Sequence, residues 1–489
     1  MTHVNEAQVR DLVSQVVQRL QADGSLPRPA GTSGAAGVVQ ATAKAQENLF
    51  GEVECAVRAT RQAQAEWAKA GLEDRHRVVA AIRAVGHRHA EALSKRAVEE
   101  TGLGRFDDKL EKLRLVLDKT PGPEDLDSRR RVWSGDHGLV LIELAPYGVI
   151  GAITPTTNPA DTVFNNAISF VSAGNGAIFN AHPTAREVSN WAARLINQAI
   201  IEAGGPAHLI TAVATPTIET ANQLMTARGV DLLVVTGGPH VVKAALQSRK
   251  KVIAGGPGNP PVVVDETADL ERAARAIYKG ASFDNNVICT LEKECVVVAA
   301  VADKLKDELK RCGAYEVPPH LHDKLFAHIF SQDHGPGKEA VVNKQCVGKN
   351  ASEILAAIGV TVDPERCRLA IVEVNRNHPL LWTEQLMPVF PITRVRDVDE
   401  AIDLAIELEG GRGHTACMHS RNIDALSKMA RLINTAIFVK NGPSLAGLGA
   451  GSDAPTAWTI AGPTGEGCTS ARHFTKERRC VLTDAFRIV

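Results

Sequence analysis

One cysteine of this chain stands where its thiol could be held at a cleft. Cys289 ends the segment Asp284-Asn285-Asn286-Val287-Ile288-Cys289, a polar turn that leads into a predicted strand. A thiol on such a turn can be tuned towards the nucleophilic thiolate, whereas Cys295, within the strand, is expected to be a small apolar filler. Spacing alone leaves Cys289 open to both interpretations, because proteins bury many inert cysteines.

A second chemical feature is a glycine pair where a predicted strand meets a predicted helix. The strand DLLVVT ends at Thr236, and Gly237 and Gly238 precede the helical segment PHVVKAALQS. Bare backbone N–H groups and the helix dipole at such a junction suit a pyrophosphate. No G-x-G-x-x-G fingerprint occurs in a strand-to-helix setting, so a simple tight turn explains the glycines equally well.

The elements that must position these residues alternate between strand and helix. Apolar runs at 139–155, 177–183, 208–214, 231–238 and 261–265 predict strands, and helices are expected at 51–70, 74–101, 186–203 and 269–279. The second helix should stop at Thr101-Gly102. Such alternation is typical of parallel sheets covered by helices, so we expect an α/β fold with two large domains.

Composition excludes several classes of protein. The chain has 489 residues, of which 44% are hydrophobic, and a formal net charge of -1, so no broad basic field exists for nucleic acid or anionic lipid. Nine cysteines without a close C-x-x-C pair or zinc-type His spacing indicate free thiols in a reducing interior and no metal site. Without a run of about 18 apolar residues or a leader peptide, we expect neither membrane insertion nor secretion.

The N-terminal segment forms a separate unit in this interpretation. Residues 1–20 predict an amphipathic helix, and residues 21–44 predict a flexible linker rich in Gly, Pro, Ser and Ala. Six aliphatic side chains share one face of this helix: Val9, Leu12, Val13, Val16, Val17 and Leu20.

Six ordered segments resemble the aldehyde dehydrogenase superfamily over about residues 45–489: 145–159, 179–183, 234–238, 254–264, 285–294 and 383–391. Within them, and in the tail motifs NGPS (441–444), GPTGEG (462–467) and ARHFTKERRC (471–480), the chain is similar to the CoA-acylating propionaldehyde and acetaldehyde dehydrogenases of bacterial microcompartments. The resemblance implies a Rossmann-type cofactor domain at 45–265, a catalytic domain at 266–440, and an extended C-terminal arm at 441–489 that supports oligomerisation.

The resemblance also implies the catalytic residues. Cys289 would attack the aldehyde, and the oxyanion would be held by the Cys289 backbone N–H and the side-chain amide of Asn158. The family's Pro-Trp-Asn-x-Pro segment corresponds here to Pro155-Thr156-Thr157-Asn158-Pro159, which displaces the asparagine by one place. Asn158 as a cap of the following helix is the alternative.

The implied cofactor is NAD, ahead of NADP. His182 replaces the Lys that many relatives place near the adenosine ribose, and the loss of that fixed charge leaves the choice between NAD and NADP open. Glu384 matches the carboxylate that bonds the nicotinamide ribose, although an ordinary surface role is the alternative. His414 belongs to a motif of the acylating group without an assigned role, and packing or hydrogen bonding explains it as well. The cofactor-binding residues expected are Thr154, Pro155, His182, Pro183, Thr236, Gly237, Gly238, Gly255 and Glu384.

The most informative departure from the family lies at residues 252–256. Val-Ile-Ala-Gly-Gly stands there, where hydrolytic relatives have Glu-Leu-Gly-Gly. Water needs a general base to release an acyl group from Cys289, whereas a CoA thiol supplies some thiolate unaided. The sequence therefore favours acyl-CoA as product. Residues 252–256 do not reveal the aldehyde; the resemblance implies a short one, propionaldehyde ahead of acetaldehyde. A hydrolytic or phosphate-handling enzyme and a non-catalytic shell-binding scaffold are the alternatives.

The resemblance extends to partners and location. The N-terminal helix is similar to encapsulation peptides that bind cargo enzymes to shell proteins, which predicts a homo-oligomer in the cytoplasm inside a bacterial microcompartment. Packing of this helix on its own or a neighbouring subunit is the alternative, and membrane association is disfavoured by its mixed charge.

Overall fold

The computed structural model describes residues 48–127 and 131–488. Residues from Asn48 onward form one compact unit. The helix and linker predicted for residues 1–44 lie outside the described residues. No helix in the described part of the chain is both long and apolar enough to cross a membrane.

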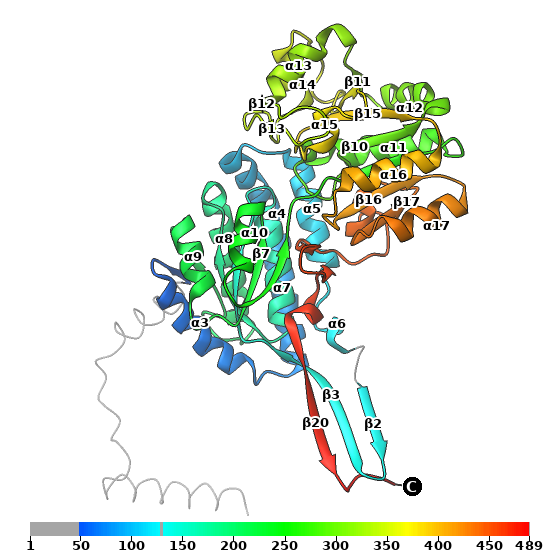
Figure 1. The fold of residues 1–489 in the computed structure, drawn as a ribbon. Helices are drawn as coiled ribbons and strands as arrows, with labels where there is room; N and C mark the ends of the chain where they lie inside the picture. Colours follow the sequence, from blue (N-terminus) through cyan, green and yellow to red (C-terminus); the bar gives the residue numbers. More distant parts are fainter. Residues whose placement is uncertain (1–47, 128–130, 489) are drawn as a thin grey trace, which may run out of the picture. The chain divides into compact units, whose positions relative to one another are not determined.

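The first sheet is parallel and covered by helices on both faces (Figure 1). Its strands follow in the order β1 (Leu49–Phe50), β6 (Ile210–Val213), β5 (Gly176–Asn180), β4 (Val149–Ile153), β7 (Leu232–Thr236) and β8 (Lys251–Gly255). Alternate strand residues enter opposite cores, because successive side chains of a strand point to opposite faces. One core includes α4 (Leu72–Thr101), α7 (Pro159–Ser172) and α8 (Arg186–Glu202), and the other α3 (Val53–Trp67), α9 (Ile218–Thr226) and α10 (Pro239–Leu246).

A second parallel sheet has the order β11 (Tyr315–Glu316), β14 (Ala370–Glu373), β15 (Val389–Val395), β10 (Glu294–Val298), β9 (Pro261–Val264), β16 (Thr415–His419) and β17 (Ile437–Lys440). One core packs α11 (Leu270–Ser282), α12 (Ala299–Arg311), α16 (Val398–Glu409) and α17 (Ile423–Leu432) against it, and another packs α13 (His322–Ile329) and α14 (Ala351–Ala357). The chain passes from the first sheet to the second between Gly255 and Pro261, a few residues before the domain boundary expected at residue 265. The α/β prediction is confirmed.

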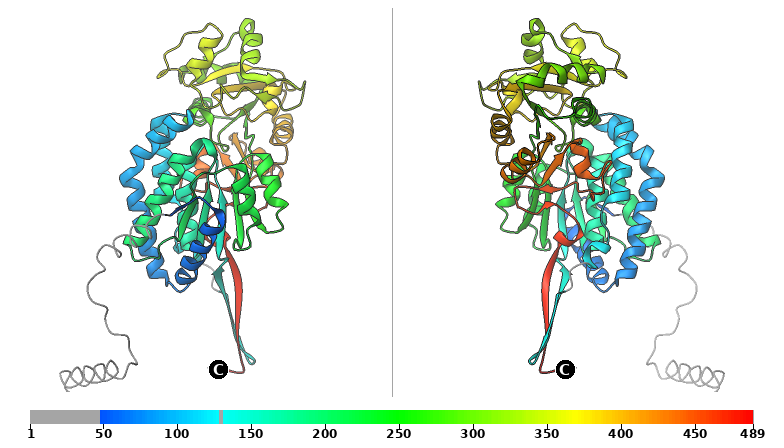
Figure 2. Two further views of the ribbon diagram at one scale, coloured as in Figure 1. Left: turned by 90° about the vertical axis from the view of Figure 1, so that its left-hand side faces the viewer. Right: turned by 90° about the vertical axis from the view of Figure 1, so that its right-hand side faces the viewer.

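The third sheet is antiparallel and consists of β2 (Arg131–Gly135), β3 (Gly138–Pro146) and β20 (Thr475–Thr483). It extends away from the first sheet (Figures 1 and 2). The apolar run 139–155 is therefore two strands in different sheets, β3 and β4, separated at Gly148, which has φ 133°. The C-terminal arm supplies β20, so residues far apart in the chain pair here.

Helix α5 (Phe106–Lys119) has no counterpart among the predicted elements. It packs against α4, α7 and the short helix η2 (Phe283–Asn286) that precedes Cys289. Its buried face carries Lys109 and Lys112 beside Leu113, Val116 and Leu117, so the apolar periodicity is interrupted by charge. The predicted helix 74–101 is confirmed as α4, which ends at Thr101 with Gly102 in the left-handed conformation (φ 67°).

Candidate active site

A cavity of 240 Å³ lies where loops from both parallel sheets and the C-terminal tail meet. The carboxyl ends of β4, β5, β7 and β8 provide one side, as expected for ligand sites of parallel sheets. Eight predicted site residues line it: Pro155, Asn158, His182, Thr236, Gly237, Gly238, Cys289 and Glu384.

Three predicted residues do not line the cavity. Thr154 is buried, and its N–H donates to the Asn180 carbonyl at 3.3 Å. A Cβ on Gly255 would lie 3.1 Å from the Ile460 carbonyl oxygen, so this glycine permits close packing of the tail on β8. Gly256 lines the cavity in its place, and Pro183 is exposed beside His182.

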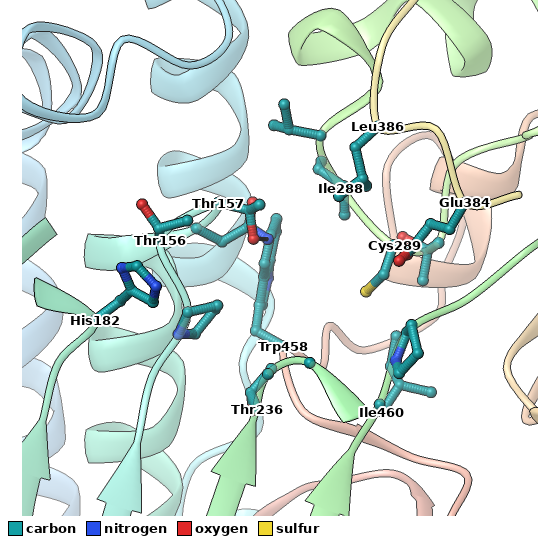
Figure 3. A pocket seen from close by; sticks show the side chains of 18 of the residues that line it. Thr156, Thr157, His182, Thr236, Ile288, Cys289, Glu384, Leu386, Trp458 and Ile460 are labelled. Carbon is teal, nitrogen blue, oxygen red and sulfur yellow. Dashed lines mark hydrogen bonds between the residues drawn. The ribbon is translucent and has the colours of Figure 1, made fainter. Parts of the chain in front are cut away.

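Cys289 is presented by an unusual turn. Three consecutive residues before it, Asp284, Asn285 and Asn286, have φ of 48°, 52° and 62°, and all three are buried. Asn286 Nδ2 donates to the carbonyls of Ala281 and Glu292, both at 2.9 Å, which holds this left-handed conformation. The Cys289 side chain is half-buried, and Figure 3 shows its sulfur pointing into the cavity. The polar turn expected from sequence is thus internal and built around hydrogen bonds.

The surroundings keep the Cys289 thiol protonated at neutral pH. Burial raises the pKa of Cys289 to about 12, and the nearby Glu384 carboxyl acts in the same direction. Lys293 opposes this shift: it is fully buried and its Nζ donates to the carbonyls of Asn286 at 2.9 Å and Ile288 at 3.0 Å. Burial lowers the pKa of Lys293 itself to about 8. The thiol proton must therefore leave as the sulfur attacks.

Glu384 lies beside Cys289 in the cavity (Figure 3). Its Oε1 accepts the Gly258 N–H at 3.0 Å, and burial raises its pKa. Glu384 is the only carboxylate among the described residues that line the cavity. Lys and Arg are absent from the same lining.

Asn158 is the residue before helix α7, yet its side chain makes no capping bond. Its Oδ1 accepts the Lys112 ammonium at 2.7 Å, and its Nδ2 donates to Thr157 Oγ1 at 3.1 Å. Lys112 and Thr157 therefore hold the Asn158 side chain, which does not cap helix α7.

The strand-to-helix junction at Thr236 is confirmed, with β7 ending there and α10 beginning at Pro239. A Cβ on Gly238 would meet nothing within 4 Å, so the backbone at this helix start is bare towards the cavity. His182 lies on the same side (Figure 3), and its Nδ1 is 2.8 Å from Thr184 Oγ1. Burial of part of its ring lowers the pKa of His182, which favours the neutral imidazole.

His414 lies under the site without lining it. Its Nδ1 is 2.9 Å from Thr415 Oγ1, and burial lowers its pKa to about 3. A Cβ on Gly258 would lie 2.6 Å from the Cys289 carbonyl oxygen and 2.9 Å from His414 Cγ, so His414, Gly258 and the Cys289 backbone are tightly packed.

Two motifs of the C-terminal segment form hydrogen bonds with the segments that carry the site. Ser444 of NGPS donates its N–H and hydroxyl to the buried Glu292 carboxylate at 2.7 and 2.6 Å, three residues beyond Cys289. Thr464 of GPTGEG accepts the Ala254 N–H of β8 at 3.0 Å. These motifs hold the loops that line the cavity.

The apolar wall of the cavity was not predicted from the sequence. Ile288, Leu386, Trp458 and Ile460 line the cavity, and Trp458 faces Cys289 from the Thr157 side (Figure 3). The contact of Lys112 with Asn158 was not predicted from the sequence either. The one sequence signal that could have pointed to these residues is proximity to Cys289, and among them only Ile288 is adjacent to Cys289.

Comparison with known proteins places these features in a family. Residues 35–449 match the aldehyde dehydrogenase family model. The acetylating acetaldehyde dehydrogenase EutE of Salmonella typhimurium is 50% identical over 442 residues, 90% of this chain and 93% of the relative. A Rhodopseudomonas palustris propionaldehyde dehydrogenase structure with bound CoA and an acylated cysteine has a TM-score of 0.87 at 47% identity, covering 90% of this chain and 99% of that one. A propionaldehyde dehydrogenase from the Clostridium phytofermentans fucose utilisation bacterial microcompartment has a TM-score of 0.87 at 42% identity, covering 91% and 100%. This chain belongs to the aldehyde dehydrogenase family.

Proposed function

We propose that this protein is a CoA-acylating aldehyde dehydrogenase that converts a short aldehyde, NAD⁺ and CoA into acyl-CoA, NADH and a proton. Cys289 is the nucleophile: its sulfur bonds to the aldehyde carbon, and the thiol proton is released to solvent as the proton of the overall reaction. The oxygen of the resulting thiohemiacetal carries negative charge, which the Cys289 N–H and the Asn158 amide stabilise. Loss of hydride then leaves a thioester on Cys289.

The residues at the α10 junction fit a nicotinamide dinucleotide. The bare backbone of Gly238 and the start of α10 suit a pyrophosphate, while Glu384 suits ribose hydroxyls. The bound nicotinamide supplies the hydride acceptor. We favour NAD over NADP because a 2′-phosphate needs a cation, and the described cavity lining offers only His182, whose pKa is lowered.

The observation that carries the acylating function is that the described residues lining the cavity include one carboxylate, Glu384, and that none stands at residue 253. Glu384 accepts the Gly258 N–H, and Ile253, in the segment where hydrolytic relatives carry their glutamate, is fully buried in the apolar core. The glutamate that serves hydrolytic relatives as general base is therefore missing at Ile253, and we assign Glu384 to the cofactor ribose. A CoA thiol exchanges one thioester for another at little free-energy cost, and the acylated, CoA-bound Rhodopseudomonas palustris relative supports this assignment.

The test is cofactor reduction without CoA. We expect one NADH per active site, followed by a stall with an acyl group on Cys289 that mass spectrometry detects, and steady turnover once CoA is added. Sustained NADH formation and free acid without CoA would contradict the acylating function. If that turnover disappeared in Glu384→Gln, Glu384 would be the hydrolytic base.

The finer assignments rest on the same resemblance. We favour propionaldehyde, then acetaldehyde, because the relatives act on these aldehydes. We also propose a homo-oligomer assembled through the exposed antiparallel sheet, and location inside a microcompartment through residues 1–20, in line with the microcompartment origin of one relative.

A further inference from the structure

Lys112 is a buried lysine that contacts the proposed oxyanion donor. It lies on α5 with 1% of its surface exposed, and its Nζ donates to Asn158 Oδ1 at 2.7 Å and to Asp284 Oδ2 at 2.6 Å. Asp161 Oδ2 is 3.6 Å away. Burial opposes its charge, but the two carboxylates outweigh burial and raise the pKa of Lys112. Lys112 is therefore an ammonium at neutral and mildly alkaline pH.

The contact decides which way the Asn158 carboxamide is turned. An ammonium can only donate, so Oδ1 must face Lys112 and Nδ2 must lie on the other branch. One Nδ2–H donates to Thr157 Oγ1, which leaves the second for a ligand in the cavity that Asn158 lines. The adjacent positive charge also polarises the amide and strengthens this N–H as a donor.

We propose that Lys112 is a positioning residue for acylation, which orients and polarises Asn158 so that its free N–H receives the developing oxyanion. This inference rests on the proposed function. Its bond to Asp284 attaches the same ammonium to the left-handed turn before Cys289. One charge thus connects the oxyanion donor with the segment that presents the nucleophile.

Lys109 provides a matched control on the same helix. It is 2% exposed and donates to the same Asp284 Oδ2 at 3.1 Å and to the Thr157 carbonyl at 3.3 Å. Within the described residues it makes no hydrogen bond with Asn158. Lys109→Met therefore removes a buried ammonium from the same carboxylate without releasing the Asn158 amide.

The experiment is a double-mutant cycle of Lys112→Met and Asn158→Ala in the full chain. The pre-steady-state rate of NADH formation is measured at saturating aldehyde and NAD without CoA, together with the cofactor Kd and Tm. We expect Asn158→Ala to slow acylation roughly 100- to 1000-fold and Lys112→Met at least about tenfold. The double variant should equal Asn158→Ala within about twofold, with Kd unchanged. Lys109→Met should lower Tm but keep the rate within about threefold of wild type.

Multiplicative losses in the double variant, or an equal slowing by Lys109→Met, would overturn the inference, because Lys112 would then act on the fold or the turn. So would a Lys112→Met rate within about twofold of wild type. If Lys112→Met does not fold, Lys112→Gln, which keeps a donor without the charge, takes its place in the cycle. Full activity of Asn158→Ala would contradict the oxyanion role of Asn158, on which this inference depends. Steady CoA-independent turnover of the wild-type enzyme would instead contradict the proposed function itself.

Discussion

At the scale of the residue, we predict opposite effects on turnover for substitutions of Cys289 and Cys295, although the two residues lie only six positions apart. Cys289→Ala should reduce aldehyde-dependent NADH formation by at least about 10⁴-fold, because no other described side chain in the cavity can form the thioester. Cys295 is fully buried in β10, so Cys295→Ala should lower Tm by the effect of a small cavity while retaining near-normal turnover. Substantial turnover of Cys289→Ala would remove the nucleophile assignment.

The thiol of Cys289 also predicts a pH profile. Its pKa, raised to about 12 chiefly by burial, means that the neutral thiol predominates below this value and the thiolate fraction rises about tenfold per pH unit. We expect the rate of inactivation of the free enzyme by iodoacetamide to rise with a slope of about one in log rate between pH 7 and 10, as long as the fold is intact. Loss of this reaction in Cys289→Ala is the control, and a plateau near pH 7 would show a thiolate that is already formed.

At the scale of the element, the antiparallel sheet exposes large apolar side chains on its surface. Trp133, Val140 and Val481 form one cross-strand row, and the outer two are 51% and 52% exposed. Exposed apolar patches occur at protein interaction sites, and we propose that this one is the interface of the homo-oligomer. Trp133→Glu with Val481→Glu should shift the protein to a smaller species in light scattering, and Lys476→Glu on β20 should not. An unchanged mass of the double variant would place the interface elsewhere.

At the scale of the whole molecule, residues 1–20 should be dispensable for catalysis but required for location. Asn48 already anchors the described fold through its Nδ2, which donates to the Ala193 and Ile210 carbonyls at 3.0 and 2.9 Å, and the family match begins at residue 35. Removal of residues 1–20 should leave kcat and KM unchanged.

We predict that the full chain binds shell protein through the six aliphatic residues of segment 1–20 that share one face of the helix predicted from the sequence. Each of these side chains would contribute about 1.5 to 3 kcal/mol if wholly buried. Leu12→Asp with Val16→Asp should abolish co-purification with shells in a host that makes them. Continued co-purification of both the truncated and the charged forms would favour a helix that packs within the enzyme.

Local periodicity and backbone freedom within a few residues were enough to predict the α/β class and the glycine junction before α10. They were also enough for five of the helices, which are α3, α4, α8, α10 and α11. Ordered motifs also sufficed to identify the family. The split of the run 139–155 between two sheets was not readable, since strand pairing depends on β20, more than 300 residues later.

The contacts that hold the site come from residues far apart in the sequence. Lys112 stands 46 positions from Asn158 and 172 from Asp284, and its interruption of the apolar face hid helix α5 from a periodicity argument. The polar turn before Cys289 is buried in part because distant residues satisfy it: Lys109 and Lys112 donate to the Asp284 carboxylate, and Asn285 donates to the Gly348 carbonyl. Charge partners and desolvation are properties of three-dimensional neighbours, so neither the raised pKa of Cys289 nor the orientation of Asn158 could be derived from residue order alone.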